Sequence, residues 1–175
     1  MTSVLKVDNI QNTSGTSALS INNNGLVIPK SVIMQVKAKN TDISHTSSSS
    51  KVEWQTVEID TINGWDSPNN RYTPSVAGYY QFGGSLRVSV VSSNPNQYYL
   101  VKVLKNGDDT DRHAIQLNVN SDLLLNNSLP IPSGIVQLNG STDYIEVHFA
   151  SDEGTILHDS TSIGSYFFAK LIHAT

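Results

Sequence analysis

The 175-residue sequence contains no cysteine. A disulfide framework and a zinc site built on thiolates are therefore both excluded. Basic residues are also few, since 11 Lys and Arg stand against 15 Asp and Glu, a formal net charge of −4. Proteins that bind nucleic acid need a concentrated positive surface. We therefore expect no nucleic-acid partner.

Long apolar runs are absent as well. No stretch approaches the ~20 apolar residues that a membrane-spanning helix requires, so we expect no membrane insertion. The start of the chain, MTSVLKVDNI, has no basic region, and Lys6 and Asp8 interrupt its apolar positions. This pattern predicts no signal peptide. We expect the protein to be made in a cytoplasm and to leave, if it acts outside, by a route such as lysis.

What the sequence has in abundance is Ser, Thr and Asn, and only 15% of its residues are charged. This composition favours strands and turns over helices. Short runs of alternating apolar and polar residues recur between turn signals such as Asn63-Gly64, Asn106-Gly107 and Asn139-Gly140. Strands at this spacing are typical of a sandwich or jelly roll. We predict an all-β, antiparallel fold of roughly eight to ten strands, either a jelly-roll β-sandwich or another β-sandwich.

The predicted strands begin with an alternation of Val32, Met34, Val36 and Ala38. The later strands are predicted over Val52–Ile59, Tyr79–Val91, Gln97–Lys105, His113–Val119, Ile131–Leu138, Asp143–Ala150 and Ser165–His173. The intervening polar stretches predict loops over Asn40–Ser50, Trp65–Asn70, Ser92–Asn96 and Ser151–Gly164.

Residues 1–28 differ from the rest of the chain. Short apolar pieces alternate there with polar turns, and such a segment cannot bury its own apolar side chains. We interpret residues 1–28 as an anchoring arm and residues 29–175 as a head domain; a frayed terminus is the alternative. The side chains expected to anchor the arm are Leu5, Val7, Ile10, Leu19 and Ile21.

The most informative stretch of the head runs from Asn69 to Leu86. The period-two pattern after Gly78 predicts that Tyr80 and Phe82 share the face of a strand that points into the core. Gly83-Gly84 within the same strand predicts a bulge or a close approach of two backbones.

The motifs Tyr72-x-Pro74 and Gly78-x-Tyr80-x-Phe82 resemble the centre of the complement C1q and tumour necrosis factor-like globular heads. Three later elements are similar to that family in the same order: Val101–Gly107, Leu138–Val147 and Ser165–Ile172. The last departs from the family's frequent Phe-x-Gly, because Ala169 stands at its third position. The resemblance covers about residues 31–173 and implies a homotrimeric jelly roll that binds partners and is not an enzyme.

The N-terminal segment LKVDNIQNTSGTSALSI resembles the opening segment of bacteriophage fibre and appendage proteins, especially those of phages that infect cyanobacteria. This second resemblance implies a virion location and contact with other virion proteins through the arm.

Chemistry-bearing motifs are scarce. No G-x-S-x-G, P-loop or paired catalytic signature occurs, and we expect no cofactor. Asp108, Asp109 and Asp111 lack the later ligands of an EF-hand loop, so we interpret them as a solvated turn and expect no metal site. His148 shares a strand face with Tyr144 and Glu146. We therefore expect His148 to be exposed or to face another subunit.

Recognition in a jelly roll belongs to its loops, and we expect the four predicted loops to lie at the end away from the anchor. Within them, Trp65, Asp66, Asn69 and Asn70 combine an aromatic ring with hydrogen-bonding groups suited to sugar hydroxyls. Trp54 is expected to pack in the core instead.

The sequence therefore predicts a non-enzymatic phage virion structural protein: a short tail fibre, a head fibre or a capsid decoration protein that can bind a host-surface glycan or protein. The alternative is a free carbohydrate- or protein-binding lectin of the same fold, and a glycan hydrolase ranks third.

Overall fold

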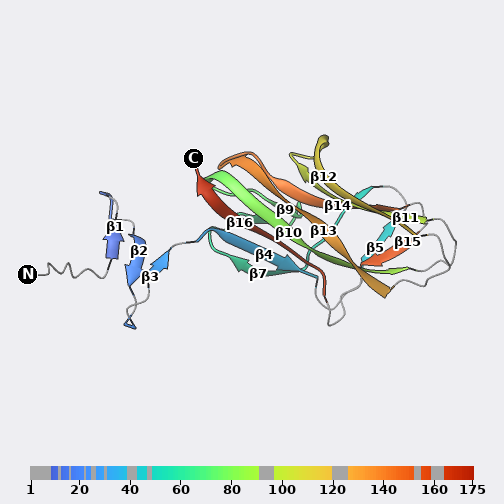
Figure 1. The fold of residues 1–175 in the computed structure, drawn as a ribbon, viewed down its shortest axis with the longest axis horizontal. Helices are drawn as coiled ribbons and strands as arrows, with labels where there is room; N and C mark the ends of the chain where they lie inside the picture. Colours follow the sequence, from blue (N-terminus) through green and yellow to red (C-terminus); the bar gives the residue numbers. More distant parts are fainter. Residues whose placement is uncertain are drawn as a thin grey trace, which may run out of the picture. The chain divides into compact units, whose positions relative to one another are not determined.

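A computed structural model describes residues 9–11, 13–15, 17–21, 23–24, 27–29, 31–38, 43–46, 49–90, 97–119, 126–151, 155–158 and 164–175. Within these ranges the chain forms strands and turns and no helix, so the protein is all-β (Figure 1). No described segment is a helix of the length and apolarity needed to cross a membrane. The chain divides into two compact units, Met1–Val32 and Ile33–Thr175. This boundary lies four residues after the predicted one.

The N-terminal unit contains an antiparallel three-stranded sheet in the order β1-β2-β3. Its strands are β1 (Asn9–Gln11), β2 (Ser17–Ile21) and β3 (Val27–Pro29). Because Pro29 pairs with Leu19, β3 extends past the predicted end of the arm. Ile10, Leu19 and Ile21 lie in this sheet, whereas the predicted anchoring residues Leu5 and Val7 lie outside the described residues.

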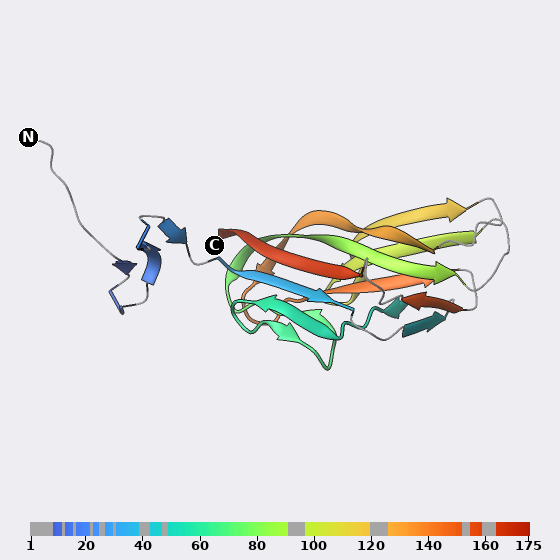
Figure 2. The ribbon, with the colours of Figure 1, turned by 90° about the horizontal axis from the view of Figure 1, so that it is seen from below.

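The second unit, which we call the head, contains two antiparallel sheets (Figures 1 and 2). The β10 sheet has the order β5-β15-β10-β16-β4-β7, and β13 pairs with β10 outside this path. Its strands are β4 (Ile33–Lys37), β5 (Ile43–Thr46), β7 (Thr56–Asp60), β10 (Ala77–Val90), β13 (Asn126–Asn139), β15 (Thr155–His158) and β16 (Tyr166–Ala174).

The other sheet of the head, the β14 sheet, has the order β12-β11-β14-β9-β8, and β6 also pairs with β14. Its strands are β6 (Ser50–Lys51), β8 (Trp65–Asp66), β9 (Arg71–Tyr72), β11 (Gln97–Lys105), β12 (Asp108–Val119) and β14 (Ile145–Ser151).

The core of the head lies between these two sheets. Tyr80 and Phe82 of β10 are completely buried, in the register that the period-two pattern predicts. Their counterparts in the β14 sheet include Val101 and Phe149, which are also buried. Alternating side chains of both sheets thus enter the core, and this burial supplies most of the stabilisation of a sandwich.

A bulge interrupts the pairing of β10 at the two adjacent glycines. Phe82 pairs with Gly134 of β13, but Gly84 already pairs with Ile131, so the register shifts between them. A Cβ atom on Gly84 would lie 2.2 Å from the backbone oxygen of Tyr166. Both features predicted for this pair of glycines, the bulge and the close backbone approach, are therefore present.

The predicted strand over Val52–Ile59 is wrong in its first half, because residues 52–55 cross between the sheets, whereas its second half belongs to β7, which begins at Thr56. Val52 N donates to Val147 O in the β14 sheet, and Gln55 N donates to Lys37 O in the β10 sheet. Trp54, midway along this crossing, is buried and stacks on Phe167 at a centroid distance of 6.2 Å. The apolar alternation of this segment thus comes from side chains that fill the space between two sheets.

Two predicted loops, Asn40–Ser50 and Ser151–Gly164, contain strands. β5 and β15 pair with each other from Ile43↔His158 to Thr46↔Thr155, and β15 also pairs with β10 at Val88–Val90. The surrounding stretches are rich in polar residues, which favours loops, but a sheet edge supplies backbone partners to any extended chain. With such short strands included, the described residues of the head form thirteen strands, β4 to β16, in place of the predicted eight to ten.

Candidate functional site

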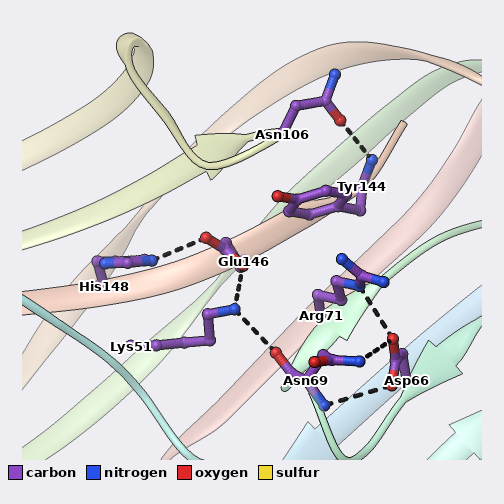
Figure 3. A network of polar contacts seen from close by, with 8 residues as sticks. All are labelled: Lys51, Asp66, Asn69, Arg71, Asn106, Tyr144, Glu146 and His148. Carbon is purple, nitrogen blue, oxygen red and sulfur yellow. Dashed lines mark hydrogen bonds and ion pairs between the residues drawn. The ribbon is translucent and has the colours of Figure 1, made fainter. Parts of the chain in front are cut away.

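The four predicted binding residues lie together in one tight hairpin formed by β8 and β9. Asp66 anchors it, because its carboxylate accepts hydrogen bonds from the side-chain Nδ2 of Asn69 at 2.8 Å and from Arg71 Nε at 3.0 Å (Figure 3). The hydrogen bonds from Asn69 and then from Arg71 outweigh partial burial and lower the pKa of Asp66. Asp66 and Asn69 therefore bind each other across the turn.

Trp65 and Asn70 also make contacts within the head. Trp65 is half-buried, and its backbone N donates to Asp60 Oδ2 at 2.8 Å. Its indole Nε1 is buried and has no hydrogen-bond partner among the described residues. Asn70 adopts a left-handed φ of 47°, and its Oδ1 accepts a 2.8 Å bond from Trp54 N. Asn70 thus connects the hairpin to the crossing segment.

The hairpin does not lie at the end where we expected it. The segment that leads into it contacts the beginning of the head, since Thr61 N donates to Ile33 O at 3.0 Å. β9 pairs with Ile145 at the start of β14, whereas β5 and β15 continue the far end of β10. The expectation that all four loops lie away from the chain entry at Ile33 is therefore wrong for Trp65–Asn70. Ser92–Asn96 lies outside the described residues.

A polar cluster centred on Glu146 lies beside this hairpin on β14. The side chain of Glu146 is only 4% exposed, and it contacts two basic groups. Lys51 Nζ lies 2.5 Å from Oε2, and His148 Nε2 lies 2.9 Å from Oε1 (Figure 3). Lys51 also donates to the backbone oxygen of Asn69 at 3.0 Å. Lys51 of β6 thus connects a buried carboxylate to the tip of the predicted binding hairpin.

The electrostatics of Glu146 are set by two opposing effects. Burial alone raises the pKa of its carboxyl, because water solvates the charged form best. The hydrogen bonds from His148 and Lys51, together with their charges, outweigh burial and lower the pKa below its ordinary value. Glu146 is therefore ionised at neutral pH and holds both basic groups in place.

A second set of contacts continues the cluster towards the β11–β12 turn. The guanidinium carbon of Arg71 lies 4.6 Å from the centre of the Tyr144 ring, a cation–π contact. Tyr144 N donates to Asn106 Oδ1 at 2.9 Å, and Asn106 Nδ2 donates to Asp143. Four segments distant in sequence thus converge at one place: β6, the β8–β9 hairpin, the turn at Asn106 and β14.

The sequence indicated part of this cluster. Tyr144, Glu146 and His148 do share a face, but that face is not simply exposed, because Glu146 is buried and His148 is only partly accessible. Lys51 and Arg71 were not predicted. Lys51 follows a run of serines and Arg71 a pair of asparagines, and neither context signals a contact with β14. Only the pairing of β6 and β9 with β14 brings them there.

The acidic residues after Gly107 are engaged locally. Asp108 Oδ1 accepts from the backbone N and the hydroxyl of Thr110, and Asp109 pairs with Lys102 at 2.8 Å. Within the described ranges, no three His, Asp or Glu side chains come together in a group that could hold a metal ion. The candidate site therefore consists of fixed hydrogen-bonding groups and two partly accessible aromatic residues, Trp65 and Tyr144, which suits noncovalent recognition.

Comparison with known proteins gives structural neighbours only. No protein-family model matches the sequence, and no curated protein matches it. The globular domain of zebrafish complement 1qA protein is 13% identical, with a TM-score of 0.56 over 83% of this chain and 100% of that one. Murine APRIL at pH 5.0 is 14% identical, with a TM-score of 0.57 over 82% of this chain and 100% of that one.

A third neighbour is the Eiger TNF of S. frugiperda, which is 10% identical, with a TM-score of 0.54 over 83% of this chain and 94% of that one. Identities this low establish the fold alone. The protein has a C1q and TNF-like antiparallel jelly-roll fold.

Proposed function

We propose that this protein is a non-enzymatic bacteriophage virion protein, a short tail fibre, head fibre or capsid decoration protein with a homotrimeric head. Two features support this function. The head has a C1q and TNF-like jelly-roll fold. The N-terminal segment LKVDNIQNTSGTSALSI resembles the opening of phage fibre and appendage proteins and forms a separate unit.

The observation that carries the proposed trimer is a group of exposed large apolar side chains on the outer face of the β10 sheet, where they lie among polar residues such as Gln81 and Lys170. On β10, Tyr79 precedes the buried Tyr80 and therefore points to the opposite face of the sheet. The other residues lie on β13 and β16, the two strands that pair with β10. The large apolar side chains exposed on β10, β13 and β16 are Tyr79, Ile135, Tyr166 and Ile172, of which Ile135 is 56% exposed. Exposed apolar groups of this kind mark interaction sites, and a closed rotational assembly of identical chains buries each copy in the same way.

In this proposal the arm joins the head to the virion, and the β8–β9 hairpin with the Glu146 cluster contacts a host-surface glycan or protein. Trp65 supplies an aromatic ring there, and the exposed Asn69 supplies amide groups. The virion is therefore the proposed location. A free lectin of the same fold is the second candidate, because the structural neighbours establish the fold and carry no information on a virion role.

Light scattering on the purified full chain tests the assembly. We expect about three times the 19.0 kDa mass of the chain. An Ile135→Asp variant should dissociate, because it places a charge among these exposed apolar side chains of the β10 sheet. A Gln116→Asp variant adds the same charge to an exposed position of β12 and should stay trimeric. A wild-type monomer at micromolar concentration would refute the trimer.

Particle association separates the two candidate functions. Purified virions should contain the protein, and deletion of residues 1–28 should leave a folded head that no longer joins them. If the full chain is absent from particles yet binds glycans or proteins in solution, the free lectin is the correct function.

A further inference from the structure

We infer that the N-terminal sheets of the three copies pack on one another through the face that carries Ile10, Leu19 and Ile21, forming a stem of identical sheets. Ile10 lies opposite Leu19 in the β1–β2 pairing. Leu19 and Ile21 are two residues apart on β2 and therefore point to the same side. This inference rests on the proposed trimer and names the partner of the arm's apolar face.

The described residues of the N-terminal unit form no second layer over this face, on which Leu19 is only partly buried. Ile10 is 51% exposed and Ile21 37% exposed, and none of the described side chains of the N-terminal unit is buried. A sheet with one apolar face must bury that face against another layer to be stable. The unit needs a partner surface, because its described residues supply no second layer of their own.

The composition of the unit indicates what that partner is. Units below about 40 residues usually need disulfides, a metal or oligomerisation to fold. Residues 1–32 contain no cysteine and no histidine, and Asp8 is their only acidic residue. They therefore lack the side chains for a disulfide or an ordinary metal centre, and of these three means oligomerisation is the one that their composition allows.

Two further observations favour other copies of the same chain. Residues 9–29 contain no charged residue, so identical sheets can meet about a symmetry axis without placing like charges together. Each sheet is also tethered to a head, and trimeric heads would raise the local concentration of the three sheets to the millimolar range that short linkers give, ~1 mM. This assigns Ile10, Leu19 and Ile21 to the contact between copies and leaves Leu5 and Val7 for the particle.

Single-cysteine variants of the full chain test the inference, because the natural sequence has no cysteine. Ile10→Cys places a thiol on the apolar face, and the adjacent Asn9→Cys places one on the opposite face of the same strand. Both variants are treated with a mild oxidant and, separately, with a short bis-maleimide. Linked chain pairs are then counted on denaturing gels, and light scattering reports whether each variant is a trimer.

The expected result is several-fold more linked pairs for Ile10→Cys than for Asn9→Cys, in variants that are both trimeric. Equal linking at both positions would overturn the inference, because it would show that the N-terminal sheets lie near one another but do not pack through one particular face. Trimers that do not link at position 10 would also overturn it, and would indicate a particle protein as the occupant while the proposed head trimer stands. Monomeric protein in light scattering would refute the trimer and the stem together.

Discussion

Replacing Glu146 by Gln tests whether the buried carboxylate stabilises the head. The change keeps the shape of the side chain and removes its charge, so that Lys51 loses an ion pair and His148 loses a charged partner. We expect the free energy of unfolding to fall by about 2 kcal/mol. The loss combines a weakened buried hydrogen bond to His148 with a lost ion pair to the partly exposed Lys51. Glu53→Gln is the matched control, because Glu53 is exposed and its replacement should change stability by less than about 0.5 kcal/mol.

The pH dependence gives a sharper test of the same variant. The pKa of Glu146 in the folded protein lies below its ordinary value of 4.5, so the ionised form stabilises the fold. This contribution is complete above pH 4.5 and is lost as the pH falls through the folded-state pKa. The difference between wild type and Glu146→Gln should therefore be full at pH 7 and shrink in acid. Asp66 and Asp143, whose pKa values are also lowered, are present in both proteins and cancel in the difference.

Urea unfolding at a fixed protein concentration measures these differences, with fluorescence of the two tryptophans as the signal. Stability of Glu146→Gln equal to wild type at neutral pH, or greater, would refute the reasoning. It would show that the free-energy cost of desolvating the Glu146 carboxylate exceeds the stabilisation from its contacts with Lys51 and His148.

Three further predictions concern the core, the bulge and the hairpin. Phe82→Ala should lower the free energy of unfolding by about 3–5 kcal/mol, because it leaves a cavity in the core; an unchanged urea midpoint would contradict this packing. Gly84→Ala should yield little folded protein on expression, since its Cβ atom would meet Tyr166 O at 2.2 Å, and normal yield with an unchanged circular dichroism spectrum would contradict it. A Trp65→Ala, Asn69→Ala double variant should weaken adsorption to host cells while the head stays folded, and unchanged adsorption would argue for a purely structural role.

The sequence predicts those features that depend on near neighbours. The alternation in β10 places Tyr80 and Phe82 in the core, because successive residues of a strand point to opposite faces. Asn106-Gly107 has positive φ values of 54° and 71°, which a two-residue hairpin turn requires and which these residue types adopt readily. The all-β, antiparallel class of the fold follows from many such local signals.

The tertiary structure decides where segments distant in sequence meet. The apolar alternation of Val52 and Trp54 is the same whether the segment is a strand or a crossing, and only the hydrogen bonds to both sheets distinguish the two. The pairing of β5 with β15 has little sequence signal, because the strands are only four residues long and β5, at the sheet edge, is held mainly by backbone hydrogen bonds that any sequence can make.

The candidate site also contains both kinds of contact, those between near neighbours in sequence and those between distant segments. The sequence by itself determined that Trp65, Asp66, Asn69 and Asn70 are close together, because six residues cannot separate far in a turn. Only the tertiary structure placed Lys51 between Asn69 and the buried Glu146, because the 94 residues between Lys51 and Glu146 carry no local signal of their pairing. Contacts of this kind depend on strand order in the sheet, and strand order is set by the packing of the whole core.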